Sequence, residues 1–344
     1  QTACVLSSGT VSLQMTLQAL GVGQGDLVIV PSLTFIATPN AVSHSGAEPW
    51  LFDVTPDTWM LDATLVRAHI EADTTAHPQG RLHTETGKIL KAITPVMIMG
   101  AVPDFQAYVA IAQDFGLKIV VDAAAAIGTT YKGGIKLGET GVDAVCYSFN
   151  GNKTLTCGGG GAVAAADPEL IDRLKHLTST GRVGKNYDHD IIAYNHRMTN
   201  VQAALGLAQI ERLSAFLERK REIRDHYADF SENYVSLSPF PNAGQGEDGH
   251  WFSGYWYTAD VDAVKINEIS DKFRDHMVAA GVDLRPFWKP IHLQTPYLAC
   301  LRTEMPVADD VWIRLFPLPC STHLSDQELK TVTDAAAEYW DKLG

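Results

Sequence analysis

The sequence predicts an α/β protein in which a mostly parallel sheet is covered by helices on both faces, followed by a smaller α+β domain. Residues 1–170 alternate short apolar runs with amphipathic runs, which is typical of parallel strands joined by helices. Beyond about residue 235, strand-like and helix-like runs mix without that regular alternation. We therefore expect a large domain at 1–210, and a linking helix with a small domain at 211–344.

The first half of the chain supplies the elements of the predicted sheet. Apolar runs that predict strands lie at 2–6, 26–30, 48–54, 91–99, 117–122, 144–149 and 161–167. Runs that predict helices lie at 11–20, 35–46 and 104–116. In the first of these, Leu13, Leu17 and Leu20 share one helix face. The polar, turn-rich stretch 71–88 predicts a hairpin or loop on the surface.

Residues 199–230 predict one long helix between the two domains. Thr199 or Asn200 can cap its start. Its apolar stripe consists of Val201, Leu205, Ala208, Leu213 and Leu217. Farther along, a strand is expected at 256–261, and helices are expected at 266–281 and 326–343.

Composition narrows the class of protein. The 344 residues are 46% hydrophobic and 19% charged, which is ordinary for a globular chain with a substantial core. The net charge of −13 disfavours binding of nucleic acid or an anionic membrane by bulk charge. Five widely spaced cysteines, without metal-ligand spacing, indicate free thiols, no metal site and a cytoplasmic protein. The chain begins with a strand and no initiator methionine, so we expect a further N-terminal segment.

The first candidate site follows the first strand, at Ser7-Ser8-Gly9-Thr10. A helix beginning there presents free N–H groups and the positive end of its dipole, which suit a phosphate group. Gly9 allows close approach of the backbone, and the Ser8 and Thr10 hydroxyls can donate hydrogen bonds. The alternative is an ordinary helix cap with no ligand.

The second and third candidates are Asp122 and Lys153. Asp122 directly follows a buried strand, at the edge where α/β folds bind ligands, and could hold a protonated ring nitrogen or merely cap the next segment. Lys153 lies in "YSFNGNKTLTCGGGGAV", where partial burial would make it a nucleophile toward aldehydes; the alternative is a solvated surface lysine. Ser148 adds a hydroxyl at the preceding strand end, and the glycine run lacks dinucleotide-binding spacing.

Together these candidates form a phosphate cradle, an acid for a ring nitrogen and a lysine for an aldehyde, which are the three contacts that pyridoxal 5'-phosphate needs. Four further stretches accompany "YSFNGNKTLTCGGGGAV" over nearly the whole chain: "SSGTVSLQMTLQALGVGQGDLVIVPSLTFIATPNAV", "VVDAAAAIG", "YNHRMTNVQAALGLAQIERL" and "RPFWKPIHLQ". This set resembles the sugar-nucleotide aminotransferases of the DegT/DnrJ/EryC1/StrS family, within fold-type I of the pyridoxal-phosphate enzymes. The resemblance implies a seven-stranded, mostly parallel sheet in the large domain.

The resemblance also implies roles for individual residues. Lys153 would bond covalently to the cofactor and then act as the base for the proton shift. Asp122 would pair with the pyridinium nitrogen, and Phe35 would stack on the ring. Asn195 would reach the cofactor phosphate of the neighbouring subunit, so the active sites would be shared within a homodimer. The phosphate in each subunit's own site would be held by Ser8, Gly9, Thr10 and Ser148.

Three features depart from the family pattern. Ala125, counted among the cofactor-binding positions, stands where the family often has Gln, His or Glu. Met97 stands where His is usual. The third is the segment that precedes the SSGT motif in the family and is not part of this sequence.

The stretch "DLRPFWKPIHLQ" is expected to bind the substrate. Its cations can offset a diphosphate, and Phe287 and Trp288 can stack on a base or sugar. The alternative is that the charges are solvated and the aromatics belong to the core. The predicted substrate-binding residues are Arg285, Trp288, Lys289 and His292.

The predicted function is transfer of an amino group from glutamate to a nucleotide-linked ketosugar for surface glycan synthesis. The hairpin-like stretch near residues 71–90, "FNGNKTLTCGGGG" and "RPFWKPIHLQ" are most similar to the subgroup that makes UDP-4-amino sugars for legionaminic acid and related glycans. This similarity makes UDP-4-keto-6-deoxy-HexNAc the expected substrate. A GDP- or dTDP-linked ketosugar, or a non-catalytic regulator with the same fold, are the alternatives. A related dehydratase would carry histidine in place of Lys153.

Overall fold

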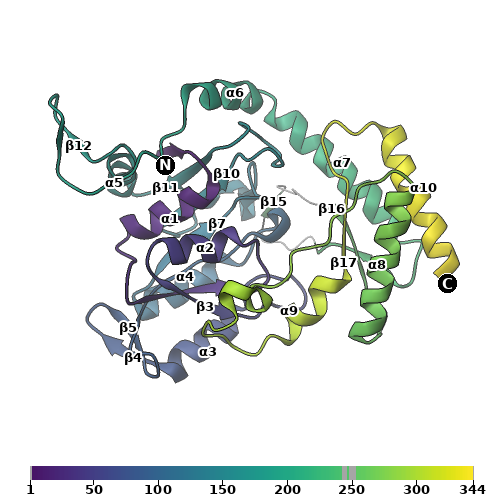
Figure 1. Ribbon diagram of the computed structural model, residues 1–344, viewed down its shortest axis with the longest axis horizontal. Coiled ribbons are helices and arrows are strands. Elements are labelled where there is room, and N and C mark those ends of the chain that lie inside the picture. The colour runs from purple at the N-terminus through teal and green to yellow at the C-terminus, as the bar shows by residue number, and fades with distance from the viewer. Residues whose placement is uncertain (1, 242–245, 248–252, 344) are drawn as a thin grey trace.

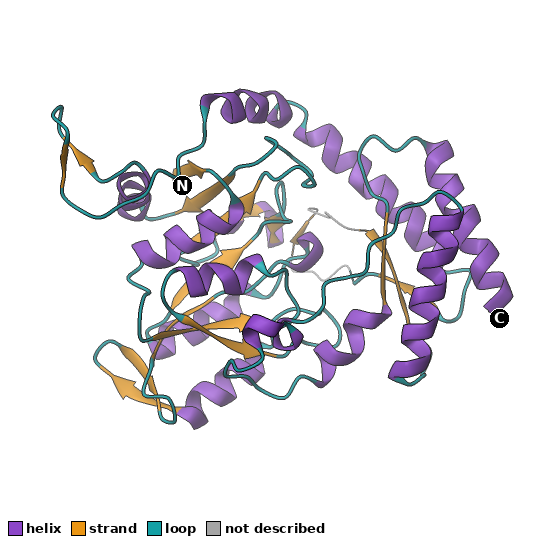
Figure 2. Ribbon diagram, in the orientation of Figure 1, coloured by secondary structure: helices purple, strands orange, loops and turns teal. Residues whose placement is uncertain are grey.

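Parallel strands with helices on both sides form the larger part of the molecule, and a smaller antiparallel sheet with helices adjoins it (Figures 1 and 2). The computed structural model describes residues 2–241, 246–247 and 253–343. In these ranges the large sheet has nine strands: seven follow the order β1-β11-β10-β7-β6-β2-β3, and the hairpin β4-β5 pairs with β6 outside that order. Strands β10, β7, β6, β2 and β3 run parallel, whereas β11 is antiparallel to both β1 and β10. The predicted α/β class with a mostly parallel sheet is confirmed.

The strands of this sheet are β1 (Thr2–Leu6), β2 (Asp26–Pro31), β3 (Glu48–Phe52), β4 (Thr74–His77), β5 (Gly80–His83), β6 (Ile89–Ile93), β7 (Lys118–Asp122), β10 (Ala144–Ser148) and β11 (Gly161–Ala165). Its helices are α1 (Gly9–Ala19), α2 (Ala37–His44), α3 (Ala63–Asp73), α4 (Phe105–Phe115) and α5 (Pro168–Thr178). Two small sheets lie outside it. One has three strands, with β8 (Thr130–Tyr131) between β9 (Ile135–Lys136) and β15 (Gly246–Glu247), and the other pairs β12 (Arg182–Val183) with β13 (Asp188–His189).

Alternation along the buried strands divides the core into two layers. On β2, Val28 and Val30 pack on one face of the sheet with α1, α2 and α5, while Leu27 and Ile29 pack on the other face with α3 and α4. All six residues of β2 are buried, as expected for a central strand covered on both faces. Because β2, β7 and β10 are parallel, their carboxyl ends meet at one edge of the sheet.

The smaller part is built on three antiparallel strands. These are β14 (Leu237–Pro239), β16 (Ser253–Tyr257) and β17 (Leu315–Leu318), packed against helices α7 (Leu213–Ser231), α8 (Ala263–Ala279) and α10 (Asp326–Leu343). Their core is aromatic: Tyr255, Phe273 and Trp340 are in mutual ring contact, and Trp340 Nε1 donates to the Tyr255 hydroxyl at 2.8 Å.

The chain returns from the smaller part to the large sheet after α8. Ile291 N–H donates to the Ser32 carbonyl at 2.8 Å, and Leu51 pairs with Leu301 and Thr303 through its backbone. Both carboxylate oxygens of Asp53 accept from the first turn of α9 (Pro306–Val311). The second half of the chain therefore contributes to the core of the large part, and the domain boundary after residue 210 stays a prediction.

The prediction of one long helix at 199–230 is wrong in one respect, because the structure has two helices there. Helix α6 (Asn200–Ile210) ends before Glu211, and α7 begins at Leu213 after Arg212 leaves helical geometry with φ −106° and ψ 2°. The two segments bury different faces. Phe216 of α7 packs inside the protein, whereas the expected stripe on α6 is exposed at Val201 and Leu205. The break turns α7 toward the smaller sheet.

Two predicted strands have different bounds in the structure, whereas the predicted hairpin and helix cap are present. The strand expected at 91–99 stops at Ile93, because Pro95 has no N–H for a strand hydrogen bond. The strand expected at 256–261 lies earlier, at Ser253–Tyr257. The stretch 71–88 contains the predicted hairpin at residues 74–83, although its first three residues end helix α3. Thr199 caps α6 in a reciprocal pair with Gln202. All five cysteines are free thiols. No helix among the described residues is long and apolar enough to cross a membrane.

Candidate active site

A cavity of about 850 Å³ lies at the carboxyl edge of the parallel strands, between the large sheet and the smaller part. This volume falls in the range of sites for small molecules and cofactors. The large part contributes Ser8, Gly9, Thr10, Leu13, Thr34, Phe35, Ala37, Val96, Met97, Asp122, Ala124, Ala125, Ser148, Asn150, Asn152, Lys153, Gly159 and Gly160. The other wall consists of Asp283, Arg285, Pro286, Phe287, Trp288, Pro317, Leu318, Pro319 and Cys320.

The N-terminus of α1 forms one end of the cavity. Ser8 is the extended N-cap residue, and its Oγ accepts from Val11 N–H at 3.2 Å, so this side chain serves as the helix cap. A Cβ at Gly9 would lie 2.7 Å from Ser148 Cβ, so only glycine lets the end of β10 approach the helix this closely. Free N–H groups of the first turn therefore lie next to two hydroxyl side chains, which is a suitable arrangement for an anion.

Asp122 ends β7 and is 5% exposed. Its Oδ2 accepts from Thr38 Oγ1 at 2.7 Å, and its Oδ1 accepts from Ala124 N–H at 3.0 Å. Burial raises the pKa of the carboxyl group, while these two hydrogen bonds and the charge of Lys153 act in the opposite direction. A turn follows Asp122 rather than a helix, so its carboxylate is not a helix cap.

Lys153 lies in the loop after β10 and is partly buried on the cavity wall. Desolvation lowers the pKa of its ammonium group to about 8, against the opposing charge of Asp122. A larger fraction of the neutral amine is therefore present near neutral pH than in a solvated lysine. The pair gives the cavity a buried acid and a nucleophilic amine.

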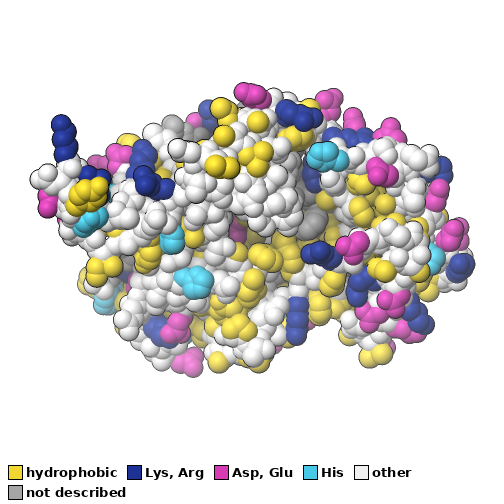
Figure 3. Space-filling model, turned by 45° about the horizontal axis from the view of Figure 1, so that its top comes forward, with side chains coloured by type: hydrophobic (Ala, Val, Ile, Leu, Met, Phe, Trp, Pro, Cys, Tyr) yellow, Lys and Arg dark blue, Asp and Glu magenta, His cyan; other side chains and the backbone are white. Residues whose placement is uncertain are grey.

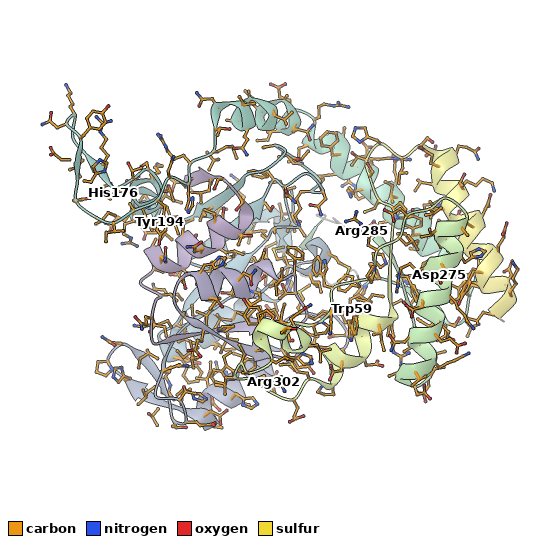
Figure 4. The ribbon with its side chains drawn as sticks, viewed as in Figure 1. Trp59, His176, Tyr194, Asp275, Arg285 and Arg302 are labelled. Atoms are coloured by element: carbon orange, nitrogen blue, oxygen red, sulfur yellow. The ribbon has the colours of Figure 1, made fainter. Side chains whose placement is uncertain are left out.

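Aromatic side chains from both walls and one arginine lie at the other end of the cavity. Phe35 is half exposed, and its ring centroid lies 5.7 Å from that of Trp288. Phe287 is buried beneath Trp288 and is in ring contact with it. Arg285 is exposed and lies between the large sheet and α8, as Figure 4 shows. The cavity therefore has polar contacts at one end and an aromatic, cationic wall at the other.

Two predicted substrate residues lie outside the cavity lining. His292 is buried, with Nδ1 2.7 Å from Ser32 Oγ and Nε2 2.9 Å from Asp309 Oδ1. Because both ring nitrogens have protein partners, its assignment to substrate binding is corrected to an anchor that ties its own segment to the large part. Lys289 is exposed and outside the lining, and its role stays a prediction.

Asn195 is also exposed and outside the lining of this cavity. Its neighbour Tyr194 lies well apart from Arg285 in Figure 4. Sequence reasoning missed two residues that the fold brings to the site. Thr38, which binds Asp122, is 84 positions away from it in the chain. Asp283 opens the stretch "DLRPFWKPIHLQ" and lines the cavity, but it was not among the residues selected from that stretch.

The cavity residues fit pyridoxal phosphate. The N-terminus of α1, which Gly9 lets approach the end of β10, suits a phosphate group. Lys153 can react with an aldehyde, and Asp122 can pair with a protonated ring nitrogen. Ala125 and Met97 both face this space, so the departures from the expected pattern lie at the site itself. Fold and site together define an enzyme of the pyridoxal-phosphate class.

Comparison with known proteins identifies the family. Residues 1–337 match the DegT/DnrJ/EryC1/StrS aminotransferase family, and the chain belongs to it. GDP-perosamine synthase of Escherichia coli O157:H7 is 34% identical over 99% of this chain and 86% of its own length. UDP-N-acetyl-3-dehydro-alpha-D-glucosamine 3-aminotransferase of Acidithiobacillus ferrooxidans is 31% identical over 95% of this chain and 81% of its own.

A solved structure shows the same fold. The DegT DnrJ EryC1 StrS aminotransferase from Brucella abortus superimposes with a TM-score of 0.87 at 26% identity, covering 99% of this chain and 86% of that one. The protein is accordingly a pyridoxal-phosphate-dependent aminotransferase.

Proposed function

We propose that this chain transfers an amino group from glutamate to a nucleotide-linked ketosugar. The observation that supports this most directly is the two-ended cavity. Asp122, Lys153 and the α1 N-terminus occupy one end, and the wall with Arg285 and Trp288 leaves room for a ligand larger than an amino acid. Both relatives reported above are named for nucleotide-linked sugars.

Bound pyridoxal phosphate supplies an electron sink for the carbon next to the transferred nitrogen. The protein's own residues prepare that chemistry. Asp122 keeps a proton on the ring nitrogen, because a buried carboxylate beside it favours the protonated form. Lys153 removes the proton from one carbon and returns it to another, for which a pKa of about 8 is well matched. The α1 N-terminus and Ser148 hold the phosphate in place.

The substrate end needs positive charge because a nucleotide diphosphate is anionic and the chain carries a net charge of −13. Arg285 is the cation in the cavity lining on that side. Its planar guanidinium group can bind phosphate oxygens in pairs. Trp288 and Phe35 offer ring surfaces for the base or the sugar.

The nucleotide of the substrate is open among three candidates. Resemblance of sequence motifs favours UDP-4-keto-6-deoxy-HexNAc, and the Acidithiobacillus relative also uses a UDP sugar by its name. The Escherichia coli relative, at slightly higher identity, is named for a GDP sugar. A dTDP-linked ketosugar is the remaining alternative.

Assembly as a homodimer with shared sites is part of the proposal. Helix α6 exposes Val201, Leu205, Leu207 and Ile210, and Figure 3 shows hydrophobic side chains grouped over the top of the molecule, where α6 lies. Several large apolar side chains exposed on one helix are typical of an interface. A second copy placed there would cover the apolar face and could bring its Asn195 to this cavity, as the resemblance implies.

The test is a substrate screen with purified protein, pyridoxal phosphate and glutamate against UDP-, GDP- and dTDP-linked 4-ketosugars, read by mass spectrometry. We expect one nucleotide class to yield an amino sugar, with no product from Lys153→Ala. Absence of product from all three would reject the sugar-nucleotide function. A cofactor absorbance band that glutamate leaves unchanged would instead favour the non-catalytic regulator.

A further inference from the structure

Asp283 is a carboxylate on the cavity wall that the chemistry above does not use. It lines the cavity together with Arg285 and Trp288, and its side chain is exposed. The cavity lining contains only one other carboxylate among the described residues, Asp122. Asp122 is already engaged by Thr38 and Ala124 at the buried end. Asp283 is therefore the acid that a bound substrate can meet at the outer end.

Asp283 and Arg285 are presented to the cavity by the same short segment. Leu284 between them is buried, and the segment is neither helix nor strand. Within the part of the chain that the structure describes, neither charged side chain has a hydrogen-bond or ion-pair partner. Two opposite charges thus remain available to a ligand, two residues apart in the chain, instead of neutralising each other.

A carboxylate in this position has an electrostatic cost for an anionic substrate. Like charges repel at close range, so Asp283 would oppose a nucleotide diphosphate unless it accepts hydrogen bonds from another part of the ligand. Arg285 can meet the phosphates, which leaves Asp283 to meet groups that donate. The relevant chemical question is which part of a nucleotide sugar offers donors that match two carboxylate oxygens.

Nucleotide bases differ in this respect. Guanine presents an N1–H and an N2 amino group side by side, which match the two oxygens of one carboxylate. Uracil and thymine present a single N–H between two carbonyl oxygens, and those oxygens would face the carboxylate unfavourably. Trp288 and Phe35 supply adjacent ring surfaces on which a purine can stack.

We infer that Asp283 selects a guanine nucleotide by accepting hydrogen bonds from the N1–H and N2 amino group of the base. This inference depends on the proposed nucleotide-sugar function and makes the GDP-linked ketosugar the substrate. The named GDP-sugar activity of the Escherichia coli relative is consistent with that choice. Replacement by Asn would keep the size of the side chain but turn one acceptor into a donor, which suits uracil better than guanine.

The test measures binding of GDP, IDP and UDP to the cofactor-loaded protein by titration calorimetry, because these nucleotides bind without reacting. IDP has the guanine skeleton without the N2 amino group, so it isolates one of the two hydrogen bonds. The variants are Asp283→Asn and, as the matched control, Asp275→Asn. Asp275 is an exposed acid on α8, outside the cavity lining and apart from Arg285 in Figure 4.

For the wild type we expect GDP to bind roughly 10-fold or more tightly than IDP or UDP, the scale of a hydrogen bond to a charged group. Asp283→Asn should lose roughly 10-fold in GDP affinity, keep or improve UDP affinity, and leave cofactor absorbance and thermal unfolding unchanged. Asp275→Asn should match the wild type with every nucleotide.

An equal loss of affinity for all three nucleotides in Asp283→Asn would overturn the inference, because the carboxylate would then contact the ribose hydroxyls that they share. Unchanged GDP affinity, or a wild type that prefers UDP, would overturn it as well and leave the aminotransferase function standing. Binding of none of the three by the wild type, together with no product in the substrate screen, would reject the proposed function itself.

Discussion

At the scale of single residues, the site depends on two ionisable groups whose surroundings move their pKa values in opposite directions. Burial raises the pKa of Asp122 and lowers that of Lys153, because in each case desolvation disfavours the charged form. Each group's charge then partly counteracts the shift of the other. The lysine is therefore a nucleophile near neutral pH, and its protonation can be measured.

Reaction of Lys153 with pyridoxal phosphate should follow its lowered pKa. Below pH 8 the ammonium form predominates and is unreactive, and above pH 8 the neutral amine predominates. Borohydride reduction after brief exposure of the apo protein to the cofactor should give labelling that rises with pH and is half complete near pH 8. Peptide mass spectrometry would locate the label. A midpoint near 10.5, or a label that persists in Lys153→Ala, would contradict the assignment.

Asp122→Asn should lower the turnover rate at least roughly 100-fold, the scale of a lost electrostatic contact at a reacting centre. An amide cannot keep the ring nitrogen protonated, so the electron sink weakens. Steady-state turnover with saturating cofactor measures the effect, and thermal unfolding checks the fold. The matched control is Asp143→Asn, whose carboxylate binds Lys118 just before the start of β10, at the opposite edge of the sheet. Similar turnover in the two variants would reduce Asp122 to a structural role.

At the scale of elements, α1 and α6 show that the role of a helix depends on the elements that pack against it. Helix α1 has ordinary capping at Ser8, yet Gly9 brings its N-terminus against β10 and makes it part of the cavity. Helix α6 has a capping box and an apolar stripe, yet that stripe faces outward. Its exposure has no explanation within one copy of the chain, which makes α6 the best place to probe assembly.

Val201→Glu should convert a dimer to a monomer if α6 lies at the interface. Val201 is 82% exposed, so the charge costs little in the monomer but much when a partner covers it. Light scattering coupled to size-exclusion chromatography would give the mass. Val264→Glu on α8, at an equally exposed valine (80%), is the control and should keep the wild-type mass. An unchanged mass for Val201→Glu would place the interface elsewhere.

At the scale of the whole molecule, the cavity joins segments from both ends of the chain. Residues 8–10 and 283–288 lie on its opposite walls, and the segment after α8 is tied to the large sheet by Ile291 and His292. Asn195 is outside its own cavity, which agrees with a site completed by a second copy.

Mixing two inactive variants tests that arrangement. Lys153→Ala and Asn195→Ala should each have little activity, and a mixed dimer should regain part of it, because one of its two sites then contains both native residues. Activity is measured after subunit exchange, with exchange confirmed by a mass-tagged subunit. The control mixes Lys153→Ala with Asp122→Asn, whose residues line the same cavity of one chain. Each site of that mixed dimer keeps one defect, so no activity should return. No recovery with Asn195→Ala despite exchange would place Asn195 outside the partner's site.

Much of the fold could be predicted from local pattern. Continuous apolar runs predicted β2 and β7, and the alternation of strands and helices predicted the parallel sheet. The turn-rich stretch 71–88 predicted the hairpin β4-β5. These features depend on neighbours a few residues apart, so a single sequence is enough to reveal them. The break between α6 and α7 was missed, because helix propensity continues through Glu211 while packing on the smaller sheet redirects the chain.

Local pattern also placed Asp122 at a strand end, Lys153 in a glycine-rich loop and Ser8 at a helix start, and it identified the chemistry that these residue types support. The tertiary structure decided which of them meet. It brought Thr38 to Asp122, placed Asp283 and Arg285 on the cavity wall, and turned His292 away into contacts with Ser32 and Asp309. The physical reason is that these contacts join residues far apart in the chain. Their formation depends on how sheets and helices pack, and hydrophobic periodicity within one segment contains no information about which distant segment will cover it.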